Sequence, residues 1–242
     1  MTDSPSPESL PGKAPGDSTA AKLEIEVIVS PPFMENTWLL HHGDGTPCIL
    51  VDPGFQPARI ISHLERRKLI PEIILLTHGH ADHIAGNQAL RKRWPNLPIL
   101  IGEGDANMLA DPVANLSGLG GVAITSPPAD QLLHEGERVT AAGLEFEVRE
   151  IPGHSPGHIV YVLNLAPAPL VLGGDVLFQG SIGRCDFPGG DQELLLRGIR
   201  TKLFTLPDET TVLPGHGDPT TVGEERLTNP YCGEQAGLFE IE

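Results

Sequence analysis

Short apolar runs alternate with helical patterns along most of the chain. In its first part the helical pattern appears twice, at 55–69 and 82–94, where apolar residues recur every three or four positions. Runs in which apolar residues alternate with others, or follow one another without a break, instead predict β-strands. Such strands are expected at 22–30, 37–42, 47–51, 72–77 and 97–103. The chain therefore begins with strands and continues into strand–helix–strand units.

The second part of the chain repeats this arrangement. Residues 138–151 predict a hairpin that turns at Gly143, and 191–204 has the spacing of a helix. Further strands are expected at 157–164, 169–175 and 210–217. Two sets of strands, each accompanied by helices, predict an α/β (α+β) protein with two sheets face to face between outer helices, a four-layer αββα sandwich. The Gly- and Pro-rich segment 110–135 predicts no particular element.

The composition predicts one soluble domain after an unstructured start. Residues 1–22 are rich in Ser, Pro and Gly and carry almost nothing to bury, so we expect a disordered tail followed by a domain over 23–242. Apolar residues make up 39% of the 242 residues, which is enough for a core. The three cysteines form no CxxC pair, which favours a reducing compartment. Without a signal-type segment or an apolar run of membrane-spanning length, the expected location is cytoplasmic.

The charge balance narrows the class of partner. The chain carries 32 acidic and 16 basic residues, a formal net charge of −16. Binding to nucleic acid or to an anionic membrane needs clustered Lys and Arg side chains against the phosphates. We therefore expect neither nucleic acid nor a membrane as a partner. The sequence leaves the oligomeric state open.

Four of the expected strands end in polar, Gly-rich loops that contain His or Asp. The segments are ILLTHGHADH, EIPGHSPGH, LVLGGDVLF and TVLPGHG. Active sites often lie on loops of this kind because a rigid scaffold positions them. Imidazole and carboxylate groups are ligands that suit zinc, and also iron or manganese. The candidate metal ligands are His78, His80, Asp82, His83, His154, Asp175 and His216.

Some of these polar residues also have a simpler explanation. Asp82 stands at the start of the helix expected at 82–94, where a carboxylate also caps the helix and interacts well with its dipole. Asp52, in VDPG, is a candidate for holding a ligand imidazole from behind, but Asp before Pro-Gly also forms turns. His158 is not counted among the ligands, because orienting a loop or bonding to the backbone explains it better than metal ligation.

The motifs THGHADH, PGHSPGH, GGD and PGHG, in this order, resemble those of the metallo-β-lactamase-fold hydrolases. The resemblance covers roughly residues 23–232 and implies the αββα fold. GGDVLFQGSIGRCDFPGGD and PGHGDPTTVGEERLTNPY look most like the short type II glyoxalases, which are hydroxyacylglutathione hydrolases. Full-length members carry a helical C-terminal domain that contacts glutathione. The residues after His216 are too few for that domain, so the glutathione site is expected to be rebuilt or absent.

The resemblance also implies a role for each ligand. His78, His80 and His154 match the ligands of a first metal, Asp82, His83 and His216 those of a second, and Asp175 the bridging aspartate. The resemblance implies two divalent ions, with zinc expected before iron or manganese. Two such ions activate a shared water and polarise a carbonyl. The expected reaction is attack of a metal-bridging hydroxide on a small-molecule thioester, S-lactoylglutathione or a related hydroxyacylglutathione. Asp82 is the expected catalytic residue, because it both ligates a metal and orients the nucleophile.

Three alternatives to this function stay open. The element GRxDF at 183–187 is similar to one in the persulfide dioxygenases of the same fold, which hold one iron; its ligands here would be His78, His154 and Asp175. A metallohydrolase for another small ester or lactone is the second alternative, and a non-catalytic metal-binding protein is the third. Arg184 either binds a substrate carboxylate or pairs with Asp186 to fix its loop, and we favour the pairing.

Overall fold

The computed structural model describes residues 22–236, which form two six-stranded sheets and a separate two-stranded pair. The first sheet consists, in spatial order, of β1 (Glu24–Ser30), β2 (Glu35–His41), β3 (Pro47–Val51), β4 (Ile70–Leu75), β5 (Ile99–Gly102) and β6 (Gln131–Leu133). The second consists of β14 (Thr220–Thr221), β13 (Thr211–Pro214), β10 (Leu170–Gly174), β9 (Ile159–Leu163), β8 (Leu144–Glu150) and β7 (Arg138–Ala141). The separate pair is β11 (Leu177–Phe178) and β12 (Ser181–Ile182).

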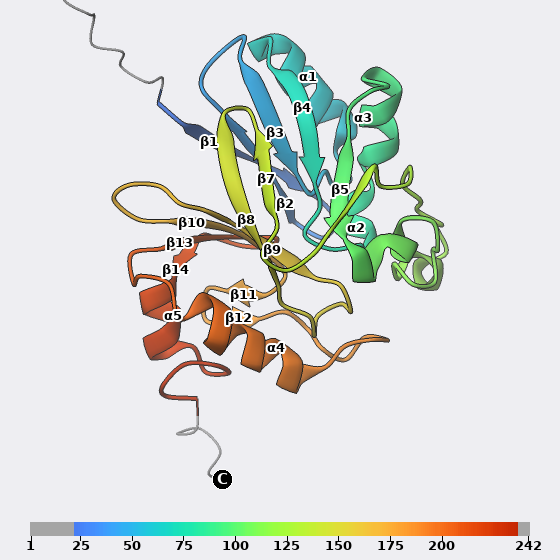
Figure 1. The fold of residues 1–242 in the computed structure, drawn as a ribbon. Coiled ribbons are helices and arrows are strands. Elements are labelled where there is room, and N and C mark those ends of the chain that lie inside the picture. Colours follow the sequence, from blue (N-terminus) through green and yellow to red (C-terminus); the bar gives the residue numbers. More distant parts are fainter. Residues whose placement is uncertain (1–21, 237–242) are drawn as a thin grey trace, which may run out of the picture.

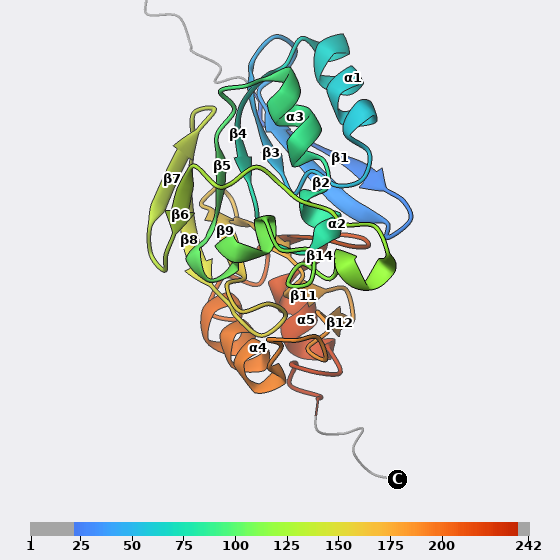
Figure 2. The same ribbon diagram turned by 90° about the vertical axis from the view of Figure 1, so that its right-hand side faces the viewer.

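Helices cover the outer face of each sheet. α1 (Pro57–Arg67) and α3 (Asn87–Arg93) pack on the first sheet, and α4 (Gln192–Gly198) and α5 (Val222–Thr228) pack on the second (Figure 1). After a quarter turn, the two helix layers lie at opposite ends of the molecule, with the short α2 (Ala81–Ile84) between them (Figure 2). Two 3₁₀-helices span Glu103–Leu109 and Ser117–Gly120, and α4 continues as a π-helix over Ile199–Leu203. The predicted four-layer αββα sandwich is confirmed.

Successive apolar side chains of the strands alternate between the two faces of each sheet, and together they form three apolar layers. In β9, Ile159, Tyr161 and Leu163 face the layer between the two sheets, whereas Val160 and Val162 face the layer under α4 and α5. β4 alternates in the same way between the central layer and the layer under α1. Successive side chains of a strand point to opposite faces, so a sheet covered on both sides buries every residue. This double burial explains the continuous apolar runs in the sequence.

The single helix predicted over 82–94 is wrong, because the structure divides it into α2 and α3. The break falls at Gly86, whose backbone N–H donates to the carbonyl oxygen of Pro53 at 2.7 Å. A side chain at Gly86 would place its Cβ 2.8 Å from that same oxygen. The chain therefore needs glycine where it passes the turn after β3, and the helix ends before that contact.

The segment 110–135, for which the sequence predicted no element, contains the 3₁₀-helix Ser117–Gly120 and β6, and one buried side chain bonds its first half to the backbone on either side. Asn115 is fully buried, and its Nδ2 donates to the carbonyl oxygens of Met108 and Ile124, both at 2.9 Å. The predicted tail at 1–22 lies outside the described residues except for Lys22, as do residues 237–242. None of the helices within residues 22–236 has the length and apolar character required to cross a bilayer.

The polar loops picked out in the sequence meet at one edge of the sandwich. β3 and β4 run parallel in the first sheet, and β10 and β13 run parallel in the second. The carboxyl ends of parallel neighbours share an edge, where α/β proteins commonly bind ligands. Asp52 and His78 follow the first pair, Asp175 and His216 follow the second, and His154 lies between β8 and β9.

Tyr161 links the two sheets beneath this edge. It is fully buried, and its hydroxyl donates to the carbonyl oxygen of Leu76 at 2.9 Å. In Tyr161→Phe that buried carbonyl loses this partner, so we expect the free energy of unfolding to fall by about 1–3 kcal/mol. Urea denaturation in the presence of a chelator measures the change. The matched control is Tyr231→Phe, at a tyrosine that is 48% exposed; equal losses in the two variants would contradict the prediction.

Candidate metal centre

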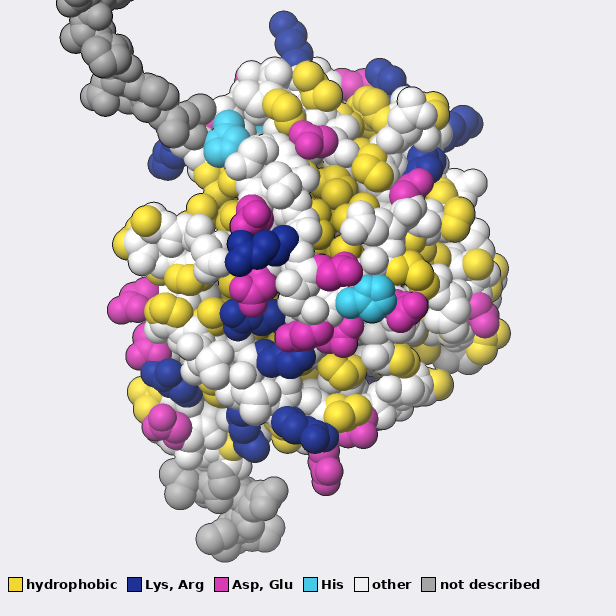
Figure 3. All heavy atoms as spheres, viewed as in Figure 1, with side chains coloured by type: hydrophobic (Ala, Val, Ile, Leu, Met, Phe, Trp, Pro, Cys, Tyr) yellow, Lys and Arg dark blue, Asp and Glu magenta, His cyan; other side chains and the backbone are white. Residues whose placement is uncertain are grey.

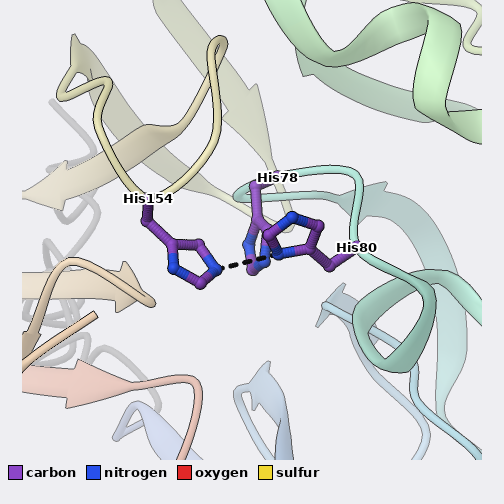
Figure 4. Close-up of side chains that lie close together, drawn as sticks. All are labelled: His78, His80 and His154. Atoms are coloured by element: carbon purple, nitrogen blue, oxygen red, sulfur yellow. Dashed lines mark hydrogen bonds between the residues drawn. The ribbon is translucent and has the colours of Figure 1, made fainter. Parts of the chain in front are cut away.

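Three histidines from two loops converge at the edge of the sandwich. His78 and His80 lie in the loop after β4, and His154 lies in the loop between β8 and β9 (Figure 4). One nitrogen from each ring lies within 4.8 Å of the other two. His80 Nδ1 is 2.9 Å from His154 Nε2, and all three residues are buried. These residues are called the three-histidine set below, and their geometry suits a metal cation.

A second group of ligands, Asp82, His83 and His216, lies beside the first and is called the Asp82 set. Asp82 and His83 belong to α2, and His216 follows β13. One ligand atom of each lies within 4.8 Å of the others. Asp82 Oδ2 is 3.3 Å from His216 Nε2 and 3.8 Å from His83 Nε2. The His216 and Asp82 side chains are 26% and 19% exposed, so the cluster opens to solvent on this side.

Asp175 lies between the two sets, immediately after β10. Its Oδ2 is 3.4 Å from His154 Nε2 and 3.5 Å from His216 Nε2. Its Oδ1 is 3.5 Å from His83 Nε2. The structure thus brings the predicted ligands together in one continuous cluster, with a single carboxylate in reach of both sets.

Hydrogen bonds on the outer side orient most of the imidazole rings. In these rings Nδ1 donates to a protein oxygen, which turns Nε2 toward the centre of the cluster. The pairs are His78 with Thr77 Oγ1 (3.1 Å), His83 with Asp52 Oδ2 (3.1 Å), His154 with the carbonyl of Arg184 (2.8 Å) and His216 with the carbonyl of Phe33 (3.1 Å). His80 instead turns its Nδ1 inward.

The chemistry of the inward-facing atoms fits divalent cations. His78 Nε2, His83 Nε2 and Asp175 Oδ1 are buried with no hydrogen-bond partner among the described residues. Buried polar atoms are rarely left unpaired without a functional reason, because the lost hydrogen bond is costly. Imidazole nitrogens and carboxylate oxygens are ligands for zinc, iron and manganese. The unpaired atoms and the type of donor therefore indicate a metal centre.

Burial and neighbouring charges set the protonation of the cluster. Burial lowers the pKa of His78 well below its usual value and the pKa of His80 to about 3, so both rings keep free lone pairs near neutral pH. Burial also opposes charging of His83, but the Asp175 and Asp82 carboxylates outweigh it and raise the pKa of this ring. Burial would raise the pKa of Asp175, but positively charged His83 holds it below the usual value. The carboxylates therefore keep their charge and require positive partners.

The structure places Asp52 behind the ligands of both sets. Its Oδ1 accepts from the Thr77 backbone N–H at 2.8 Å, and its Oδ2 accepts from the Thr77 hydroxyl at 2.7 Å. The same Oδ2 accepts from His83 Nδ1, and Thr77 Oγ1 in turn accepts from His78. Asp52 also adopts a positive φ of 48° before Pro53. The residue therefore forms the turn and holds an imidazole at the same time.

Arg184 lies on the loop after β12, close to the three-histidine set. Its guanidinium forms a fork with Asp186, with Nε–Oδ1 at 2.9 Å and Nη2–Oδ2 at 2.7 Å. It also lies 4.3 Å from the centre of the Phe187 ring, which contacts His80 edge-on. The loop borders a cavity of about 350 Å³ that also contacts Tyr231. Arg184 is therefore paired with Asp186, which offsets its charge, as the sequence favoured.

Two buried carboxylates near the cluster, Glu35 and Asp105, were not predicted as part of the site. Burial raises the pKa of Glu35 well above its usual value, and no pattern in the sequence marks this residue at the start of β2. Asp105 follows β5 in LPILIGEGD, so the strand-end pattern used for the other loops was sufficient to find it. His158, not counted as a ligand, accepts from the Asp175 backbone N–H through Nε2 at 3.0 Å.

Removing the charge between the two sets is expected to weaken metal binding at both. Asp175→Asn keeps the shape of the side chain but lowers its ability to ligate cations, so the loss should exceed the 10- to 100-fold typical of outer-shell changes. Metal content after dialysis, measured by mass spectrometry, checks this expectation. Asp208→Asn, at an exposed carboxylate that pairs with Arg226 away from the cluster, is the control and should bind metal as the unmodified protein does. An Asp175→Asn protein with its full metal content would remove Asp175 from the ligands.

The amino-acid sequence matches the family model described as the metallo-β-lactamase superfamily over residues 30–216. It is 41% identical over 201 residues to the probable metallo-hydrolase YqgX of Bacillus subtilis, covering 83% of this chain and 93% of that protein. It is 34% identical over 215 residues to the hydroxyacylglutathione hydrolase GloC of Haemophilus influenzae, covering 88% of this chain and 100% of that protein.

Similar solved structures share the whole sandwich. The B3 metallo-β-lactamase BLEG-1 has 39% identity and a TM-score of 0.81 and covers 86% of this chain and 99% of its own. TTHA1623 in a di-iron-bound form has 36% identity and a TM-score of 0.70, covering 85% and 99%. ETHE1 from Myxococcus xanthus has 28% identity and a TM-score of 0.69, covering 86% and 84%. With its fold, its cluster of histidines and aspartates and these matches, the chain belongs to the metallo-β-lactamase superfamily.

Proposed function

We propose that the protein is a dinuclear metal-dependent hydrolase that cleaves the thioester of a hydroxyacylglutathione such as S-lactoylglutathione. The observation that carries the proposal is the position of Asp175, whose carboxylate lies within 3.5 Å of nitrogens from both ligand sets. A carboxylate shared in this way suits two cations held side by side. The three-histidine set would hold one ion and the Asp82 set the other, with Asp175 in contact with both.

The donors fit more than one divalent metal. Histidine-rich sites with carboxylates suit zinc, but they also suit iron and manganese. The related TTHA1623 structure is a di-iron form. We therefore propose two ions per chain, with zinc and iron as the first metals to test.

The proposed reaction divides the work between the metal and the chain. Bound divalent ions lower the pKa of a water molecule toward neutrality and polarise a substrate carbonyl. Asp82, on the open side of the cluster, orients the attacking water and accepts its proton. Water adds to the carbonyl carbon, the C–S bond breaks, and the products are a carboxylate and a thiol. A thiolate leaves readily, so the reaction needs no strong general acid.

Two observations support a small-molecule thioester over other substrates. GloC, which is named a hydroxyacylglutathione hydrolase, aligns with this chain over its full length. The net charge of −16 disfavours an anionic polymer as the substrate. On the face shown in Figure 3, acidic and basic side chains are interspersed, so that face offers no continuous basic surface for such a polymer. The cavity beside Arg184 and Tyr231 also offers space for the thiol carrier, on the loop whose Arg184 carbonyl accepts from His154.

A specific contact also favours a second candidate, an iron-dependent persulfide dioxygenase with one ion. The 183–187 element packs against the three-histidine set, because the Arg184 carbonyl accepts from His154 Nδ1 and the Phe187 ring contacts His80. The ETHE1 structure is also a neighbour of this chain. In this alternative the ion would be held by His78, His154 and Asp175, and the Asp82 set would not bind a second ion.

Metal content measured together with parallel assays separates the candidates. We expect about two divalent ions per chain, hydrolysis of S-lactoylglutathione with release of free thiol, and loss of this activity on chelation with recovery on adding metal back. Oxygen uptake with glutathione persulfide tests the dioxygenase, and a chromogenic cephalosporin tests lactam hydrolysis. One iron per chain, with oxygen uptake on glutathione persulfide and no thiol released from S-lactoylglutathione, would overturn the main proposal.

The proposed role of Asp82 predicts a loss in turnover more than in binding. In Asp82→Asn the carboxylate that takes up the proton is lost, so kcat should fall at least about 100-fold while KM changes little. The assay is run at saturating metal, with metal content confirmed on the same sample. Asp208→Asn, at a carboxylate that is 55% exposed and pairs with Arg226 away from the cluster, serves as the control and should keep its kcat. A change confined to KM in the Asp82 variant would contradict the catalytic assignment.

A further inference from the structure

Asp105 joins the two loops that carry the three-histidine set. It follows β5, is completely buried, and accepts three hydrogen bonds. Its Oδ2 accepts from the Gly79 backbone N–H at 3.0 Å and from the Ser155 hydroxyl at 2.6 Å. Its Oδ1 accepts from the Gly157 backbone N–H at 2.6 Å. Gly79 lies between His78 and His80 in the sequence, and Ser155 follows His154, so one carboxylate is bonded beside every member of the set.

The backbones around Asp105 also approach each other closely. A Cβ at Gly104 would lie 2.7 Å from Gly157 Cα, and a Cβ at Gly157 would collide with the backbone nitrogen of Asp105. A Cβ at Gly79 would lie 2.5 Å from the Met108 Cβ. Glycine at these positions lets the segment 102–105 lie directly against both ligand loops, so a shift of one loop must displace the other or break a bond to Asp105.

We infer that Asp105 is a positioning residue that sets the separation of the two ligand loops, and through it the affinity of the three-histidine set for a divalent cation. The 2.9 Å between His80 Nδ1 and His154 Nε2 spans the two loops that Asp105 joins. The inference rests on the metal site of the proposed function, but it does not depend on the substrate. Outer-shell partners of this kind typically change metal affinity 10- to 100-fold when they are replaced.

A second buried carboxylate offers a matched control. Glu225, on α5, is 1% exposed and also accepts three hydrogen bonds. The donors are the Thr220 hydroxyl (2.6 Å), the Asn229 side-chain amide (2.7 Å) and the Gly180 backbone N–H (2.9 Å). These bonds tie α5 to β14 and to the turn between β11 and β12. Glu225 therefore resembles Asp105 in burial and bonding but does not connect the ligand loops.

The test compares Asp105→Asn with Glu225→Gln in metal-free protein. In each variant a side-chain amide NH₂ replaces one carboxylate oxygen and faces a group that also donates a hydrogen bond. One bond is therefore lost, and both variants should lose thermal stability. Titration with Zn²⁺ against a chromogenic chelator measures the affinity of each binding step, and Co²⁺ absorption reports the ligand geometry. We expect Asp105→Asn to weaken one step at least about tenfold and to alter the cobalt spectrum. Glu225→Gln should leave both steps and the spectrum unchanged.

Ser155→Ala keeps the test decisive if Asp105→Asn does not fold. It removes one of the three donors and leaves the carboxylate in place, so it should weaken the same binding step to a smaller extent. The inference would be overturned if the Asp105 and Ser155 variants kept the zinc affinity and cobalt spectrum of the unmodified protein. It would also be overturned if Glu225→Gln weakened zinc binding as much as Asp105→Asn does. An unmodified protein that binds no divalent ion would overturn this inference and the proposed function together. A protein that binds metal but does not hydrolyse thioesters would overturn only the proposed function.

Discussion

The cluster depends on the hydrogen bonds that hold its imidazoles by their outer nitrogen. For His154 and His216 the acceptors are backbone carbonyls, so the path of the chain itself orients these rings. For His83 and His78 the orientation comes from Asp52, directly in one case and through Thr77 in the other. One buried carboxylate thus aligns candidate ligands of both sets, so a turn residue after β3 also supports the candidate metal centre.

The chemistry of the cluster and the choice of substrate are separated in the structure. The ligands lie at the edge between the sheets, where relatives with different names share the same fold. The loop after β12 lies to one side, and its Arg184 is already paired with Asp186. A paired arginine binds a carboxylate only by exchanging one partner for another, which lowers the net gain. If the cavity binds the substrate as proposed, selectivity on this side would depend more on the shape of the cavity than on a free positive charge.

Much of this structure could be predicted from the sequence, because apolar periodicity and strand-end motifs are local signals. They predicted the αββα sandwich and the candidate ligands that the structure brings together. They failed where the outcome depends on segments that meet only in the folded chain. Gly86 ends a helix because Pro53 lies against it, which the spacing of residues 82–94 does not reveal. The bonds of Asp105 to Gly79, Ser155 and Gly157 are equally non-local.

Each sheet contributes part of the cluster: His78 and His80 come from the first, and His154, Asp175 and His216 from the second. Neither the three-histidine set nor the Asp82 set comes from one sheet alone, so both proposed sites would form only in the folded sandwich. A ligand that binds only the folded state stabilises it by mass action, by about 2.7 kcal/mol at a concentration 100 times Kd. Metal supply in the cell would then control the amount of folded protein as well as its activity, and metal starvation would favour its degradation.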